Sequence, residues 1–106
     1  MQFLIVTKQS SAPPPEMTLP LLQAMEAWLA EHRSSGKMKS VWAFAGTVGG
    51  GGVLDVDSHE ELDEIMLGFP FAPFSTTEVL ALSDIDRNLQ GSKAVFQRII
   101  ETMGKP

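Results

Sequence analysis

Apolar and polar positions follow two different periods along this chain, and the period predicts which elements form. Four short runs are rich in β-branched and other apolar residues, which is typical of strands. The predicted strands cover residues 2–8, 39–47, 52–57 and 76–82. Two longer segments, 17–34 and 58–67, repeat apolar residues every three or four positions, which predicts amphipathic helices. The stripe of the first helix consists of Leu21, Leu22, Met25, Trp28, Leu29 and His32.

Turn and cap residues mark the ends of these elements. Thr18 is the predicted N-cap of the first helix, and Gly36 is free to adopt the left-handed conformation that ends it. Ser58 and Glu61 form the S-x-x-E capping box that starts the second helix. The consecutive glycines Gly49–Gly52 lie between two predicted strands, so we expect them to form a turn or the tip of a bulged hairpin.

The elements follow the order β-α-β-β-α-β in a single α+β domain of 106 residues. This order predicts the ferredoxin-like fold, in which two helices cover one face of a four-stranded antiparallel sheet. We expect the core at about 1–85 and a C-terminal helical extension at about 86–106. Helical spacing continues over 91–103, where the apolar residues are Ala94, Val95, Phe96, Ile99, Ile100 and Met103.

The second face of the sheet is also predicted to be covered. Along 41–48 both alternating sets of residues are apolar or small, and left bare they would form a large apolar patch, which monomers rarely expose. The simplest solution is a homodimer in which two sheets pack face to face, a dimeric α+β barrel. The C-terminal helix has two options, since Phe96, Ile99 and Ile100 suit contact with the partner or with their own subunit.

Composition narrows the function further. The chain contains no cysteine, which excludes disulfides, thiolate catalysis and cysteine-based metal sites. Its net charge of −5 and pI near 4.8 argue against nucleic acid as a partner, because such binding needs a basic surface. No targeting sequence or membrane-spanning apolar run is evident in the sequence. We expect a soluble, cytoplasmic protein without a membrane partner.

Two ionisable residues are candidates for proton transfer. His32 continues the Trp28 side of the first helix, and histidine titrates near neutral pH, which suits a general acid or base. The alternative is a half-buried histidine that interacts with the last carbonyls of the helix. Glu78 lies among apolar neighbours in the last strand, where it either faces a pocket or lies at an exposed edge. The acidic residues around His59 lack a metal-site pattern, so no metal is expected.

Aromatic residues of the second strand and of the segment before the last strand are candidates for a ligand pocket. They are Trp42, Phe44, Phe71 and Phe74. Their rings either line a cleft between the sheet and the helices or pack in the core. Apolar pockets with a few polar groups are typical of small-molecule sites. We therefore expect a small-molecule ligand, bound without a cofactor.

A sparse pattern between residues 35 and 82 carries a family resemblance. It consists of Ser35-Gly36-Lys37, Trp42, Gly46, Val53-Leu54-Asp55-Val56-Asp57-Ser58-His59-Glu60-Glu61-Leu62, Pro70, Pro73 and Glu78-Val79. In order and spacing it resembles the muconolactone isomerase-like family of small ferredoxin-like proteins, over about residues 1–85. The resemblance implies a dimeric α+β barrel that often assembles further. It also implies proton transfer within an unsaturated lactone, without a metal or cofactor.

Three positions depart from that family. The isomerases carry histidine and arginine in the first strand and an arginine after the strand-two tryptophan, whereas this chain has Leu4, Val6 and Ala43 there. An anionic substrate needs a cation to hold its carboxylate, and none of the three supplies one.

Because these three basic residues are missing, the expected ligand differs from that of the isomerases. We expect a cofactor-independent, isomerase-like enzyme that transfers a proton within a small lactone or an aromatic, polyketide-like ring compound, more apolar than muconolactone. The alternative is a non-catalytic binding or assembly module on the same dimeric fold. A cofactor-free oxygenase is a third option.

Overall fold

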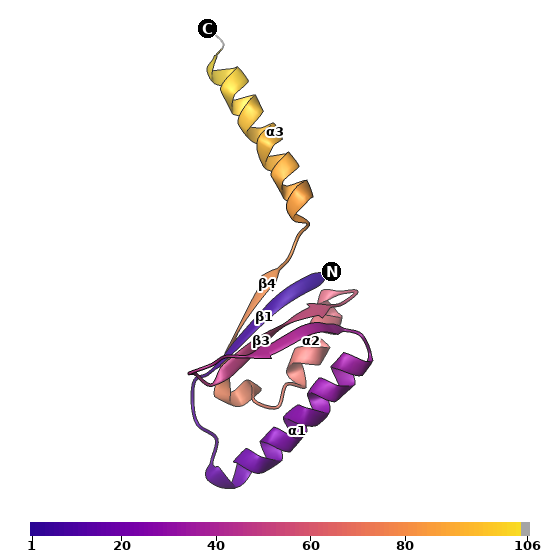
Figure 1. Ribbon diagram of the computed structural model, residues 1–106, viewed down its shortest axis with the longest axis vertical. Helices are drawn as coiled ribbons and strands as arrows, with labels where there is room; N and C mark the ends of the chain where they lie inside the picture. The colour runs from indigo at the N-terminus through magenta and orange to yellow at the C-terminus, as the bar shows by residue number, and fades with distance from the viewer. Residues whose placement is uncertain (105–106) are drawn as a thin grey trace.

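The computed structural model describes residues 1–104, which form one four-stranded sheet and three α-helices (Figure 1). The elements are β1 (Gln2–Gln9), α1 (Pro15–Ser34), β2 (Met38–Ala43), β3 (Gly49–Asp55), α2 (His59–Leu67), a 3-10 turn (Ala72–Phe74), β4 (Ser75–Ala81) and α3 (Ile85–Met103). The sheet has the order β2-β3-β1-β4, and every neighbouring pair is antiparallel. The predicted ferredoxin-like α+β fold is thereby confirmed.

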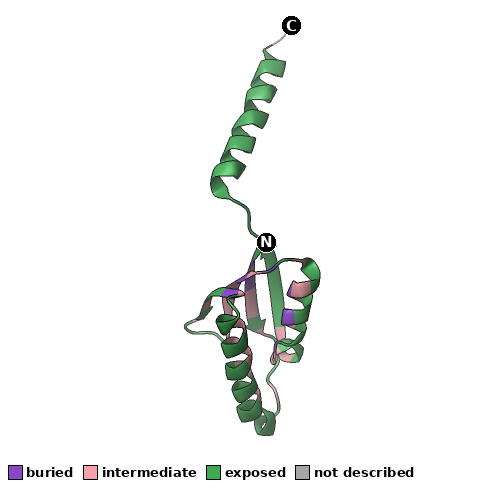
Figure 2. Ribbon diagram, turned by 90° about the vertical axis from the view of Figure 1, so that its right-hand side faces the viewer, coloured by how far each residue is buried: buried purple, intermediate pink, exposed green. Residues whose placement is uncertain are grey.

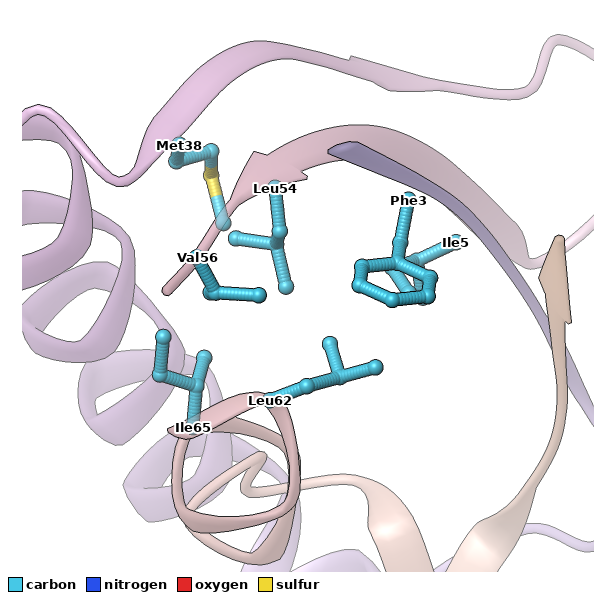
Figure 3. Packing of buried hydrophobic residues seen from close by; sticks show 7 residues of the cluster. All are labelled: Phe3, Ile5, Met38, Leu54, Val56, Leu62 and Ile65. Carbon is cyan, nitrogen blue, oxygen red and sulfur yellow. The ribbon is translucent and has the colours of Figure 1, made fainter. Parts of the chain in front are cut away.

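The core lies on the face of the sheet that α1 and α2 cover. Strand pairing puts Phe3 opposite Leu54, so both side chains share that face. Leu62 and Ile65 of α2 approach them from the other side (Figure 3), and Leu54 is only 1% exposed. The buried cluster consists of Phe3, Ile5, Met38, Leu54, Val56, Leu62 and Ile65. Burial of this apolar surface is what holds α2 on the sheet.

The other face of the sheet is open. Leu4 lies opposite Leu80 in the β1–β4 pair, and Val6 lies opposite Glu78. No helix of the described chain covers these residues, since α1 and α2 both lie on the core side (Figure 1). Leu80 is 51% exposed as a result. The predicted apolar second face is therefore present and uncovered in the single chain.

Helix boundaries test the predicted caps. The Ser58 hydroxyl accepts a hydrogen bond from the Glu61 N–H at 3.1 Å, which confirms the cap of α2. Gly36 has a φ of 77°, the left-handed conformation expected after α1. The prediction for Thr18 is wrong, because α1 begins at Pro15 and Thr18 lies inside the helix. Proline suits the first helical position because it lacks an N–H and its φ is already helical.

The prediction that the glycine run forms a hairpin tip is also wrong. Gly49–Gly52 are the first residues of β3, which pairs with β1 on one side and with β2 on the other. The connection between β2 and β3 is the segment 44–48. A Cβ on Gly52 would lie 2.8 Å from the Ser40 carbonyl oxygen, so close approach of the backbones requires glycine there. In this strand the glycines matter because they lack a Cβ, and their backbone flexibility is not what the position requires.

α3 extends away from the rest of the chain (Figures 1 and 2). It begins at Ile85, next to the start of the extension predicted at about 86–106, and the Asp84 carboxylate caps it by accepting a hydrogen bond from the Asp86 N–H at 3.0 Å. None of its residues is buried, and the described chain is 72 Å long. Of the two options for this helix, packing on its own subunit is not what the structure has. Residues 105–106, the end of the predicted extension, lie outside the described residues.

Candidate functional site

A cavity of about 500 Å³ lies between the sheet and α1. On the helix side its lining extends from Leu22 to Arg33, a separation of roughly 16 Å along the helix axis at the usual rise per residue. On the sheet side Ile5, Val41 and Leu54 contribute apolar side chains. A cavity of this size and lining is suited to a small organic ligand.

Bare backbone forms part of the cavity wall. All four glycines of the run Gly49–Gly52 line the cavity. Trp42 lies against this strand, since a Cβ on Gly51 would be 2.9 Å from the Cζ2 atom of its indole ring. The glycines of β3 therefore leave room for a large aromatic side chain at the edge of the sheet, and they add no side chains of their own to the cavity.

Aromatic rings form another wall. Trp28 Nε1 donates a hydrogen bond to the Ile65 carbonyl oxygen at 3.1 Å, which fixes the indole between α1 and α2. Its ring centroid lies 5.4 Å from that of Phe69, and Phe69 meets Phe71 edge to face at 6.4 Å. All three rings line the cavity. Packing and one hydrogen bond thus hold an apolar wall in a fixed position.

The structure divides the predicted pocket residues into two groups. Trp42 and Phe71 line the cavity, whereas Phe44 and Phe74 lie outside the described lining. Phe44 follows β2 and Phe74 ends the 3-10 turn, so both belong to connections rather than to the walls. The cavity brings Trp42 and Phe71 together with Trp28, a residue of the apolar stripe predicted for the first helix.

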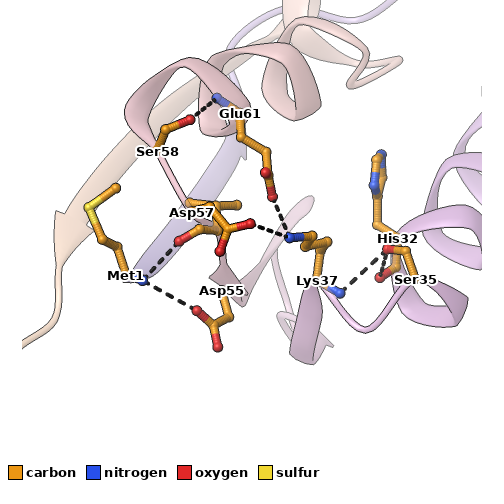
Figure 4. Close-up of polar contacts among 9 residues, drawn as sticks. Met1, His32, Ser35, Lys37, Asp55, Asp57, Ser58 and Glu61 are labelled. Carbon is orange, nitrogen blue, oxygen red and sulfur yellow. Dashed lines mark hydrogen bonds and ion pairs between the residues drawn. The ribbon is translucent and has the colours of Figure 1, made fainter.

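The two candidate proton-transfer residues lie apart from each other. The His32 ring contacts the Trp28 ring edge to face, with centroids 5.1 Å apart, but His32 is not among the described residues that line the cavity. Ser35 donates a hydrogen bond to the His32 carbonyl oxygen at 3.1 Å, at the very end of α1 (Figure 4). Glu78 lies on the open face of the sheet, opposite Val6. Their catalytic roles stay predictions.

Sequence reasoning missed Arg33, the one charged residue among the described lining of the cavity. Arg33 comes four residues after Leu29, and residues so spaced lie on the same side of a helix. His32 has the same relation to Trp28, so the apolar stripe of α1 has two edges, one ending in His32 and the other in Arg33. By spacing alone, His32 and Arg33 are equal candidates for contact with the cavity. The way α1 packs on the sheet places Arg33 in the cavity lining.

Lys37 is held in an acidic network outside the cavity (Figure 4). Its Nζ lies 2.8 Å from Glu61 Oε1 and 3.4 Å from Asp57 Oδ2. The hydrogen bond with Glu61, followed by the one with Asp57, raises the pKa of Lys37 above its ordinary value. These three residues are part of the motif that carried the family resemblance, and their role in the structure is to tie the end of α1 to the start of α2.

Two kinds of feature do not occur within residues 1–104. No three side chains of histidine, aspartate or glutamate come together as a metal ion would require. No helix there combines the length and the hydropathy needed to cross a membrane.

Comparison with known proteins places the chain in a family. The family model described as muconolactone delta-isomerase matches residues 1–86. The chain belongs to this family. The motif resemblance is thereby confirmed, and the matched span ends at the start of α3.

Two muconolactone delta-isomerases share part of the sequence. That of Acinetobacter baylyi is 34% identical over 58 residues, which are 55% of this chain and 60% of the relative. That of Rhodococcus opacus is 31% identical over 58 residues, 55% of this chain and 62% of the relative. The chain thus aligns with about three fifths of the length of these relatives.

Two solved structures share the fold. A crystal structure of muconolactone isomerase superposes with a TM-score of 0.71 at 23% identity, covering 79% of this chain and 90% of the other. The 5-chloro-2-hydroxyhydroquinone dehydrochlorinase of Burkholderia phenoliruptrix AC1100, in complex with 2,5-dihydroxybenzoquinone, gives a TM-score of 0.55 at 20% identity, covering 82% and 98%. At these identities the two structures support the fold alone.

Proposed function

We propose that this member of the muconolactone delta-isomerase family is a cofactor-independent enzyme that moves a proton within a small ring compound, either a lactone or an aromatic, polyketide-like molecule. The observation that carries the proposal is the cavity of about 500 Å³ between the sheet and α1. Its aromatic and aliphatic lining suits the flat faces of a ring. Family membership over residues 1–86 supports an isomerase-type reaction.

His32 is the proposed general acid or base. Its ring contacts Trp28, which lines the cavity, so of the two candidates His32 lies nearer to a ring bound there. Glu78 is the second candidate, and it requires a different setting. It lies on the open sheet face, where a second subunit would have to enclose it to form a site.

The test is muconolactone turnover by the purified chain, followed by ultraviolet absorbance. The variant His32→Ala is compared with His59→Ala, which changes the chain's other histidine, an exposed residue at the start of α2. Turnover that is lost in His32→Ala and kept in His59→Ala supports the proposed role. Equal turnover in both variants contradicts it.

A non-catalytic binding module is the second candidate, and one observation favours it. The described lining of the cavity contains no histidine and no carboxylate, so the groups that most often transfer protons are not in contact with its interior. A binding module raises its melting temperature with ligand and leaves the ligand chemically unchanged. A thermal-shift screen of lactones and hydroxylated aromatic compounds, followed by product analysis, distinguishes the two functions.

We also propose that the chain forms a homodimer in the cytoplasm, and that α3 takes part in the contact. The open face of the sheet and α3 both expose large apolar side chains, and monomers rarely carry a large exposed apolar patch. Phe96 is 64% exposed and Ile100 is 68% exposed. α3 follows the edge strand β4 directly, so one two-fold contact could cover the sheet and the helix together. The absence of cysteine suits a reducing compartment.

Light scattering after size-exclusion chromatography tests the assembly. The full chain is expected at twice its mass of 11.5 kDa, or at a higher multiple. Phe96→Asp should shift it toward the monomer, because a charge would be buried in the contact. Gln97→Asp is the matched control, since its side chain lies about 100° away around the helix. A full-length chain that elutes as a monomer would contradict the proposal.

A further inference from the structure

The cavity combines an apolar interior with a single cation. Arg33 is the one charged residue among its described lining residues. The remaining polar side chains of the lining are Thr7, Gln9 and Ser75. Gln9 and Ser75 are paired across β1 and β4, so these three polar residues lie together at the end of β1. The charge and the uncharged polar groups therefore come from different elements.

The two polar regions lie toward opposite ends of the cavity. Arg33 is in the last turn of α1, close in sequence to Met38 at the start of β2, which also lines the cavity. Gln9 is the last residue of β1, and the chain runs from there to the start of α1. α1 is 20 residues long, or roughly 30 Å. The apolar wall of Leu22, Met25 and Leu29 lies between these ends.

Within residues 1–104 Arg33 takes part in no ion pair and its guanidinium makes no hydrogen bond to the protein. Its position in the last helical turn is favourable for a cation on electrostatic grounds, but that effect needs no contact with the cavity. An arginine fork matches a planar carboxylate with two parallel hydrogen bonds. Arg33 is an exposed residue that lines the cavity, so its guanidinium is free to hold a carboxylate there.

We propose that Arg33 is a specificity-determining residue of this cavity, which selects among apolar ring compounds for those that carry a carboxylate. The ring lies between the aromatic wall and the glycine strand, and the carboxylate lies at the end of α1. This inference rests on the proposed small-molecule function of the cavity and makes it more specific. It also identifies a cation in a chain that has Leu4, Val6 and Ala43 where the family resemblance implies basic residues.

A matched pair of probes tests charge selection. The probes are 2-naphthoate and 2-naphthamide, which share one ring system and differ in charge, and their binding to the full chain is measured by isothermal titration calorimetry at low ionic strength. The full chain is expected to bind naphthoate roughly five- to tenfold more tightly than naphthamide, the range for a partly exposed charge-assisted contact. The preference should shrink as salt is added.

Three variants locate the source of the preference. Arg33→Gln should bind the two probes equally, and Arg33→Lys should keep part of the preference, because an ammonium retains the charge but not the fork. Lys39→Gln removes one positive charge from an exposed position on β2 outside the described lining, and it should keep the full preference. Far-UV circular dichroism of Arg33→Gln checks that α1 is intact.

The outcomes separate this inference from the proposed function. If both probes bind but the full chain has no preference, or if Arg33→Gln keeps it, the role of Arg33 is overturned while ligand binding in the cavity stands. If neither probe binds, the cavity is not a site for ring compounds, and both the proposed function and the role of Arg33 fall. A preference lost equally in Lys39→Gln would assign it to net charge and likewise overturn the role of Arg33.

Discussion

α2 and α3 are both amphipathic, but the apolar face of α2 is buried and that of α3 is exposed. α2 has nine residues, and its apolar residues Leu62 and Ile65 are buried against the sheet. α3 has 19 residues with a longer apolar stripe, and none of them is buried. The difference is visible in Figure 2, where buried positions occur around the sheet and α2, while α3 is exposed along its whole length. Amphipathic spacing predicts that a helix has an apolar face but does not say what covers it.

The family match sharpens this contrast. It covers residues 1–86 and stops as α3 begins. The body, residues 1–82, therefore contains the shared fold, the core and the cavity, and α3 is an addition that the body does not need for its own packing. We infer that the stability of the body and the behaviour of α3 can be changed independently. Four predictions examine that independence, from the largest expected effect to the smallest.

Core truncation should separate the two regions most clearly. Leu54→Ala truncates one of the two most buried side chains and is expected to lower the free energy of unfolding by about 2–5 kcal/mol. Phe96→Ala in α3 should change it by less than about 0.5 kcal/mol in a dilute sample, because its ring contacts little in the single chain. Urea denaturation followed by fluorescence reports on the body alone, since both tryptophans lie there. An equal loss in the two variants would show that α3 belongs to the body's cooperative unit.

Alanine at two glycines should have opposite effects. Gly52→Ala puts a Cβ 2.8 Å from the Ser40 carbonyl oxygen and should destabilise the body by about 1–3 kcal/mol. Gly91→Ala in α3 has no neighbour within 4 Å and should stabilise that helix by about 0.5–1 kcal/mol. Thermal melting measured by fluorescence and by far-UV circular dichroism distinguishes the effects. A stable Gly52→Ala variant would contradict the close strand approach described for β3.

Removal of the two helix caps should be detected by different methods. Ser58→Ala and Asp84→Ala each remove one capping hydrogen bond, which is worth about 1 kcal/mol in typical cases. Loss of the Ser58 cap should lower the global free energy of unfolding, because α2 is packed in the core. Loss of the Asp84 cap should lower only the helical signal at low temperature. Global destabilisation by Asp84→Ala would mean that α3 is coupled to the sheet.

The smallest effect concerns pH and is confined to the body. Contacts with Glu61 and Asp57 raise the pKa of Lys37 in the folded chain, so the folded state binds this proton more tightly than the unfolded state. The stabilisation is therefore fully present below the ordinary lysine pKa of about 10.4 and is lost as pH rises through the raised value. Urea denaturation between about pH 9 and about pH 11.5 should show a steeper alkaline loss for the natural chain than for Lys37→Met. Parallel curves would contradict the role of the network.

Local signals predicted those parts of the fold that depend on neighbouring residues. The Ser58 cap and the left-handed Gly36 were predictable because each effect acts within one helical turn. The extension predicted at about 86–106 starts next to Ile85, the first residue of α3, whereas the apolar spacing over 91–103 covers only the later part of the helix. The glycine run was misassigned because its partners, β1 and β2, lie far away in the sequence. Glycine is equally compatible with a turn and with a closely packed strand.

In the candidate site, too, some residues could be predicted from the sequence and others depended on tertiary contacts. Aromatic character pointed to Trp42 and Phe71, both of which line the cavity. His32 and Arg33 were equivalent in the sequence, since each follows an apolar residue of the stripe by four positions. The rotation of α1 about its axis decides which of the two contacts the cavity, and that rotation is set by the Trp28–Ile65 hydrogen bond and by contacts with the sheet.

The sequence by itself determined the order of elements, the family and the face of each helix that is apolar, because these follow from spacing and from short motifs. Only the tertiary structure decided that the glycines lie inside the sheet, that Arg33 reaches the cavity and that α3 is left without cover. The physical reason is that each of these depends on contacts between segments distant along the chain. Such contacts are specified by the complementary shapes of whole surfaces, which no local pattern contains.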